Sequence, residues 1–157
     1  MKLRLICVGK LAEAWQRSAA DDYAGRITRY FSFATIELKE EKGGRKGDTR
    51  GLLKREGTRI LEKVPPRAFL IVLDERGRHL ASEALADLLS DEMVHGGRDW
   101  YLVIGGPYGL DPAVRQRADL VLSLSKMTFT HQMARVLLLE QLYRSCTIIK
   151  NEPYHNR

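Results

Sequence analysis

Ala68-Phe-Leu-Ile-Val-Leu-Asp74 is a run of apolar residues that ends in an acid. A β-strand buried on both faces has this pattern, because helices cover both faces of a parallel sheet. Trp100–Ile104 and Leu120–Leu124 are two further runs of the same kind. These three segments predict the central strands of a mainly parallel sheet.

Segments with helical periodicity alternate with the strands. Apolar residues recur every three or four positions within residues 12–30, 49–64, 82–95 and 130–145, and a short helix is expected after Asp111, where Pro112 takes a favoured first position. Leu3–Val8 and Phe31–Leu38 have the pattern of two more strands. This alternation predicts an α/β fold, with a mainly parallel sheet and helices on both faces. Ligands of such sheets bind beyond the carboxyl ends of the strands.

Length and composition predict a single domain over residues 1–157, since 157 residues with 44% hydrophobic and 29% charged content suit one core. No apolar run is long enough to cross a bilayer, and Met1–Gly9 resembles a first strand more than a signal peptide. Cys7 and Cys146 each lie in an apolar segment, which fits buried thiols in the reducing cytoplasm. The chain has no His, Cys, Asp and Glu grouping with zinc-ligand spacing, so we expect no metal.

The formal net charge of +6 favours an anionic partner, most often nucleic acid. The basic residues concentrate around Gly43-Gly44. They are Lys39, Lys42, Arg45, Lys46, Arg50, Lys54, Arg55 and Arg59. Such a run is either a phosphate-contacting surface or a solvated loop and helix face, and the sequence leaves both open.

Two segments that follow successive buried strands can line one crevice. Gly105-Gly106 lets the backbone approach a ligand closely, although a tight turn alone needs the same residues. Ser123–Phe129 offers many backbone and hydroxyl groups for its length. Neither segment completes a dinucleotide fingerprint or a Walker lysine motif, which disfavours a small nucleotide-binding enzyme.

The last predicted helix contains four consecutive apolar residues, Val136-Leu-Leu-Leu139. Such a run covers most sides of a helix. A helix of this kind is enclosed by the fold or lies against a partner, so we expect a homodimer.

Several motifs, in order along the whole chain, closely resemble the bacterial 23S rRNA pseudouridine N3-methyltransferases of the SPOUT class of α/β-knot methyltransferases. Each motif is weak alone, but the ordered set is specific. The motifs are Met1-Lys-Leu, the basic glycine-rich loop, Ile104-Gly-Gly-Pro-Tyr-Gly109, Leu122-Ser-Leu-Ser-Lys-Met-Thr-Phe129, His131-Gln-x-x-Arg135-Val136, Glu140-Gln-Leu-Tyr-Arg144 and Pro153-Tyr-His155.

The resemblance implies an S-adenosyl-L-methionine-dependent enzyme that methylates N3 of a pseudouridine in 23S rRNA, acts on the ribosome as a homodimer and has a C-terminal trefoil knot. It implies a cofactor site at Leu73, Gly105, Gly106, Leu124, Ser125, Lys126, Met127, Thr128 and Phe129. Tyr108 stands where relatives often have glutamate, so it receives no catalytic role.

Three residues near the C-terminus are the candidate catalytic groups. His155 is a candidate base or orienting group, since an imidazole takes up a proton near neutral pH. Tyr154 could stack on the base or hydrogen-bond its edge, and Arg144 could stabilise negative charge on the uracil ring or hold a phosphate. The alternative for each is a surface residue on a frayed end. His131 and Arg135 are interpreted as structural. The competing functions are a tRNA methyltransferase and a non-catalytic RNA-binding ribosome assembly factor.

Overall fold

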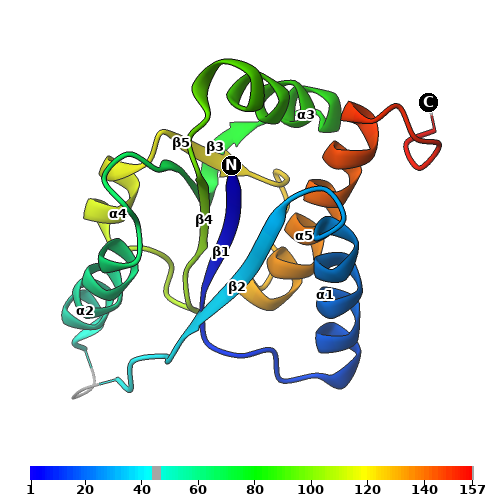
Figure 1. Cartoon of the computed structure of the whole chain (residues 1–157). Helices are drawn as coiled ribbons and strands as arrows, with labels where there is room; N and C mark the ends of the chain where they lie inside the picture. The colour runs from blue at the N-terminus through cyan, green and yellow to red at the C-terminus, as the bar shows by residue number, and fades with distance from the viewer. Residues whose placement is uncertain (44–46, 157) are drawn as a thin grey trace.

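The computed structural model describes residues 1–43 and 47–156 and contains a five-stranded sheet (Figure 1). The strands are β1 (Lys2–Val8), β2 (Ser32–Leu38), β3 (Phe69–His79), β4 (Trp100–Ile104) and β5 (Leu120–Ser123). Their order is β2-β1-β4-β3-β5, and every neighbouring pair is parallel. The predicted strands and the parallel sheet are thus confirmed, whereas the trefoil knot stays a prediction.

The described residues form five α-helices close to the predicted positions, of which four connect strands and the last follows β5. They are α1 (Ala14–Ile27), α2 (Thr49–Glu62), α3 (Ser82–Asp91), α4 (Pro112–Arg117) and α5 (His131–Ile149), and a π-helical turn, η1 (Glu92–Gly96), extends α3. The side chain of Asp48 caps α2, that of Asp111 caps α4, and that of Thr130 caps α5. Caps of this kind satisfy amide groups that the first helical turn leaves unpaired. α5 is longer than predicted because it continues through Ile149.

The sheet separates two hydrophobic cores. Leu3, Leu5 and Cys7 of β1 point into one core, and Ile6 and Val8 point into the other, as the two-residue period of a strand requires. Buried side chains of α1, α3 and α5 belong to the first core, and those of α2 and α4 belong to the second. The prediction of helices on both faces is therefore confirmed.

α5 is covered more fully by its own chain than the sequence suggested. It packs against α1, α3 and β4, and none of its residues is exposed. Val136 and Leu137 are half-buried, whereas Leu138 and Leu139 are buried. The fold thus encloses much of the apolar run that motivated the homodimer, and the dimer needs separate support.

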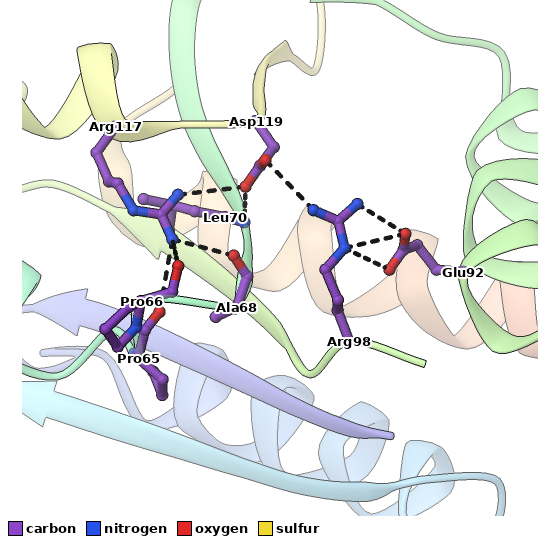
Figure 2. Close-up of polar contacts among 8 residues, drawn as sticks. All are labelled: Pro65, Pro66, Ala68, Leu70, Glu92, Arg98, Arg117 and Asp119. Atoms are coloured by element: carbon purple, nitrogen blue, oxygen red, sulfur yellow. Dashed lines mark hydrogen bonds and ion pairs between the residues drawn. The ribbon is translucent and has the colours of Figure 1, made fainter. Parts of the chain in front are cut away.

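A polar network holds the amino ends of the central strands in place (Figure 2). Asp119 accepts a hydrogen bond from the backbone amide of Leu70 and forms ion pairs with Arg117 and Arg98. Arg98 also forms a forked pair with Glu92 of η1, at distances from 2.7 to 3.2 Å. The Arg117 guanidinium donates to the carbonyls of Pro65, Pro66 and Ala68. These bonds fix where β3 and β5 start, and thereby the positions of the loops at their opposite ends.

Candidate active site

A cavity of about 1490 Å³ lies at the carboxyl ends of β3, β4 and β5. Its lining includes Leu73, residues 104–111 and most of the segment 122–132. The structure therefore brings together the two segments that were expected to line one crevice. The helix α2 supplies another side of the cavity, which the sequence did not indicate. Ligand pockets usually measure about 300–1,000 Å³, so this cavity has room for more than one small molecule.

A tight hairpin follows β4 and forms one side of the cavity. Gly106 and Gly109 form a β-bridge, and Gly109 has a positive φ of 90°. A Cβ atom on Gly105 would lie 2.5 Å from the carbonyl oxygen of Gly109. The hairpin therefore closes only because position 105 has no side chain. The absence of a side chain at Gly105 thus allows the tight turn, and it also lets a ligand approach the backbone closely.

The loop between β5 and α5 forms a second side of the cavity. The Ser123 hydroxyl donates to the carbonyl oxygen of Ser125, and the Ser125 hydroxyl accepts from the backbone amide of Met127. Of the expected cofactor residues in this loop, Leu124, Ser125, Met127, Thr128 and Phe129 line the cavity. Lys126 is exposed and does not line it.

β3 leaves its ladder for four residues beside the cavity. Leu122 of β5 pairs with both Leu73 and Arg78, so residues 74–77 are displaced from the sheet. Gly77 allows this, since a Cβ there would lie 2.6 Å from the carbonyl oxygen of Val121. The displaced segment also reaches the opposite loop, where the Thr128 hydroxyl donates to Glu75 at 3.2 Å.

Asp74 in this segment forms an ion pair that the sequence did not reveal. Its carboxylate contacts Arg115 of α4 at 2.9 Å and Arg76 at 3.1 Å, and its side chain is only 9% exposed. Burial alone would raise the pKa of Asp74, but hydrogen bonds from Arg76 and Arg115 outweigh it and lower the pKa to about 2. Arg115 ties the cavity segment to α4.

We expect Asp74→Asn to destabilise the fold and to change its acid sensitivity. The folded pKa lies below the ordinary value of 3.8, so the ionised carboxylate stabilises the fold above pH 4, and this contribution is lost as the pH falls towards 2. The ionised carboxylate contributes roughly 2 kcal/mol to the free energy of unfolding. Urea unfolding at pH 7 and at pH 3 should show a smaller difference in the variant than in the wild type. An unchanged difference would mean that Asp74 is not held ionised by its partners.

The candidate catalytic residues form a cluster with two glutamates. Arg144 donates from Nε at 3.1 Å and from Nη2 at 2.6 Å to one carboxylate oxygen of Glu140, and its guanidinium lies 4.9 Å from the centre of the Tyr154 ring. The Tyr154 hydroxyl donates to the same Glu140 carboxylate at 3.0 Å. His155 contacts Arg144 through Nδ1 at 3.2 Å and Glu83 through Nε2 at 3.3 Å. The tail is thus packed onto α3 and α5 rather than frayed.

These contacts define the chemical state of the cluster. An arginine can only donate, so His155 Nδ1 accepts from Arg144, and the proton of a neutral ring lies on Nε2, towards Glu83. Burial is the largest cause that raises the pKa of Tyr154, so its hydroxyl stays protonated at neutral pH. Glu140 raises the pKa of Arg144, which keeps its charge. Nothing in the sequence singles out Glu83 beyond its place at a helix start.

The cluster does not line the cavity of its own chain. His131, at the start of α5, lines the cavity, and Arg144 comes 13 residues later in the same helix. At 1.5 Å per residue, about 20 Å of helix separates the two. Figure 1 shows α5 running back along the sheet, so that the C-terminus lies near the end where the strands begin. The structure therefore places the candidate cofactor and catalytic residues at opposite ends of one protomer.

The remaining candidates divide between structural and open roles. Arg135 is buried and pairs with Glu37 of β2 at 3.0 Å, which agrees with its structural interpretation, whereas His131 faces the cavity. Arg45, Lys46 and the terminal Arg157 lie outside the described residues. Cys7 and Cys146 are buried and unpaired, and burial raises the pKa of each thiol to about 12.

Neither a metal site nor a membrane span emerges from the described part of the chain. The His, Cys, Asp and Glu residues within 1–43 and 47–156 form no group of three that could hold a metal ion. The helices of the same ranges are too short or too polar to cross a membrane.

Comparison with known proteins assigns this chain to a family of methyltransferases. The family model described as "Predicted SPOUT methyltransferase" matches residues 1–155. Two similar proteins are both named "Ribosomal RNA large subunit methyltransferase H". The one from Syntrophotalea carbinolica is 54% identical over 157 residues, and the alignment covers all of both chains. The one from Trichlorobacter lovleyi is 47% identical over 156 residues, and the alignment covers 99% of this chain and all of the other. The crystal structure of a tRNA (m1G37) methyltransferase from Aquifex aeolicus aligns with 100% of this chain and 76% of its own, with a TM-score of 0.59 and 12% identity.

The fold and the match define a methyltransferase of the α/β class. The chain belongs to the SPOUT methyltransferase family. The methyl donor of this family, S-adenosyl-L-methionine, suits the cavity. Leu73, Leu122 and Leu124 offer apolar contacts for an adenine ring, and the backbone of the glycine hairpin and of the β5–α5 loop offers hydrogen-bonding groups for polar parts of the donor.

Proposed function

We propose that this protein transfers a methyl group from S-adenosyl-L-methionine to N3 of a pseudouridine in the 23S rRNA of the large ribosomal subunit. The observation that carries the proposal is the cavity at the carboxyl ends of β3, β4 and β5, lined by the glycine hairpin and the β5–α5 loop. The chain aligns over nearly its full length with relatives named as large-subunit rRNA methyltransferases, which supports rRNA as the substrate class. The net charge of +6 suits an RNA substrate.

The cofactor is proposed to bind in this cavity. Its residues there are Leu73, Gly105, Gly106, Leu124, Ser125, Met127, Thr128 and Phe129, with Lys126 adjacent in the loop. When bound, the donor supplies a methyl group on a positively charged sulfur. The volume beyond the usual size of a ligand pocket leaves space for the acceptor nucleotide.

The chemistry requires that N3 lose its proton and bond to the methyl carbon while the carbon–sulfur bond breaks and its electron pair stays on sulfur. The chain must align the two reactants and accept the proton. We propose that His155 orients the acceptor base or, once its Nδ1 is released from Arg144, accepts the proton, that Arg144 stabilises negative charge on the uracil ring, and that Tyr154 stacks on the base. Glu140 orients both Arg144 and Tyr154.

We further propose that the protein acts as a homodimer in which the tail of one protomer reaches the cavity of the other. About 20 Å of helix separates Arg144 from the cavity of its own chain, and a reaction within hydrogen-bonding reach cannot bridge that distance. A second copy supplies the missing residues without a rearrangement of α5. Exposed apolar side chains beside the cavity, including Met127 and Phe129, are available for such a contact.

The function is tested by incubating purified protein with S-adenosyl-L-methionine labelled in the methyl group and with ribosomes that contain or lack pseudouridine in 23S rRNA. We expect label only in pseudouridine-containing rRNA, at N3 when the modified base is mapped. Label on tRNA instead would identify a tRNA-modifying enzyme. Ribosome binding without cofactor binding in calorimetry would identify an assembly factor.

A further inference from the structure

Among the described residues, the basic side chains of α2 fall into two pairs, of which one forms ion pairs and the other does not. Arg55 pairs with Glu41 at 3.4 Å and with Asp48 at 3.6 Å, and Arg59 pairs with the same Glu41 at 3.1 Å. Arg59 also donates to the carbonyl oxygen of Lys39 at 2.7 Å. These two arginines hold the segment after β2 against the helix, and nearby carboxylates balance their charges.

Arg50 and Lys54 are placed differently. They lie one helical turn apart, both are exposed, and both line the cavity. Within residues 1–43 and 47–156, no hydrogen bond or ion pair engages either side chain. Two uncompensated cations therefore face the space in which the acceptor nucleotide would enter.

An exposed aromatic ring borders the same cavity. Tyr108 occupies the tip of the Gly106–Gly109 turn, is 64% exposed and lines the cavity. The hairpin and the start of α4 both lie against α2, because a Cβ atom on Gly106 would lie 3.5 Å from a carboxylate oxygen of Glu56, and one on Gly57 would lie 2.7 Å from Cβ of Asp111. The ring and the two cations thus belong to adjoining parts of one rim.

We propose that Arg50, Lys54 and Tyr108 bind an unpaired stretch of the substrate RNA next to the reacting nucleotide. The two cations contact backbone phosphates, and the tyrosine ring stacks on an unpaired base. Cationic side chains combined with an exposed aromatic ring are the features by which proteins hold single-stranded nucleic acid. A duplex would hide its base faces from Tyr108. The inference rests on the proposed function and assigns its RNA-recognition residues.

The test uses a fluorescein-labelled stem-loop RNA with an unpaired loop, and the same loop sequence annealed to its complement. Fluorescence anisotropy measures Kd between 50 and 200 mM salt. We expect R50Q/K54Q to raise the Kd for the stem-loop about tenfold at 50 mM salt, and to reduce the slope of log K against log salt by about 1.4, or 0.7 for each lost phosphate contact. Y108A should raise the Kd about tenfold without changing the slope, and Y108F should bind like the wild type.

A matched control removes the same charge elsewhere. Arg29 and Lys63 are exposed and do not line the cavity, so R29Q/K63Q should bind the stem-loop like the wild type. An equal loss in this control, an unchanged Kd and slope in R50Q/K54Q, or an equal effect of Y108A on the duplex would each overturn the inference. A shift in oligomeric state of the variants on size exclusion would also overturn it, by showing that the rim contacts a second copy. All variants should bind S-adenosyl-L-methionine like the wild type, whereas a wild type that neither binds it nor labels ribosomes contradicts the proposed function itself.

Discussion

Gly105→Val is expected to weaken the binding of S-adenosyl-L-methionine by at least about a hundredfold, which corresponds to ~2.7 kcal/mol. The first added carbon would lie 2.5 Å from the Gly109 carbonyl oxygen and 2.9 Å from Leu110 Cδ2. The Gly109 carbonyl cannot move without opening the hairpin, because Gly109 already uses a positive φ to close it. Isothermal calorimetry with the purified variant measures the loss.

Gly25→Val is the matched control for this substitution. No atom lies within 4 Å of a Cβ atom built on Gly25, which is exposed on α1 away from the cavity. It should bind the cofactor with wild-type affinity. Far-UV circular dichroism establishes whether each variant is folded. A folded Gly105→Val protein that binds the cofactor normally would remove the hairpin from the cofactor site.

Arg144→Ala is expected to lower kcat for methylation by about a hundredfold to a thousandfold, while the Kd for S-adenosyl-L-methionine stays within about twofold of the wild type. The substitution removes a cation, the partner of His155 Nδ1 and the group that lies over the Tyr154 ring. Arg144→Lys keeps the charge but cannot reproduce the two-pronged donation from Nε and Nη2 to Glu140, so we expect an intermediate kcat. Loss of cofactor affinity in step with kcat would show that the tail belongs to the cofactor site instead.

Mixing the two variants distinguishes a shared site from a self-contained one. If the tail of one protomer serves the cavity of the other, a mixed dimer of Gly105→Val and Arg144→Ala has one intact cavity facing one intact tail. Random pairing makes half of the dimers mixed, each with one of two sites complete, so about a quarter of wild-type activity should return. Recovery would also show that Gly105→Val folds. If each tail serves its own cavity, the mixture stays inactive.

The fold could be read from the sequence because its signals are local. The buried run at residues 68–74 and its two counterparts indicated parallel strands, and they form β3, β4 and β5. The approach of the glycine turn to the segment 123–129 also followed from general rules, since the carboxyl ends of all strands of a parallel sheet lie at one edge, and in the described sheet only β3 lies between β4 and β5. Local pattern and sheet topology together were sufficient for two sides of the cavity but not for the side that α2 supplies.

The polar partners could not be predicted in the same way. Asp74 meets Arg115, 41 positions later, and His155 meets Glu83 across 72 positions, and nothing in the local sequence links the members of either pair. The division of basic residues on α2 depends equally on tertiary structure, because Arg55 and Arg59 meet Glu41 only when the segment after β2 folds back onto the helix. Apolar periodicity in the sequence predicts which side chains are buried. Whether a charged side chain forms an ion pair depends on which distant segment packs beside it.

The length of α5 has a consequence for how the protein behaves on dilution. If the proposed shared site is correct, with the donor cavity at one end of α5 and the reactive groups at the other, turnover depends on an encounter between two molecules. Specific activity should then fall as enzyme is diluted below its self-association constant, although each isolated molecule still captures the methyl donor. Newly made protein would remain inactive until its concentration was high enough for dimers to form.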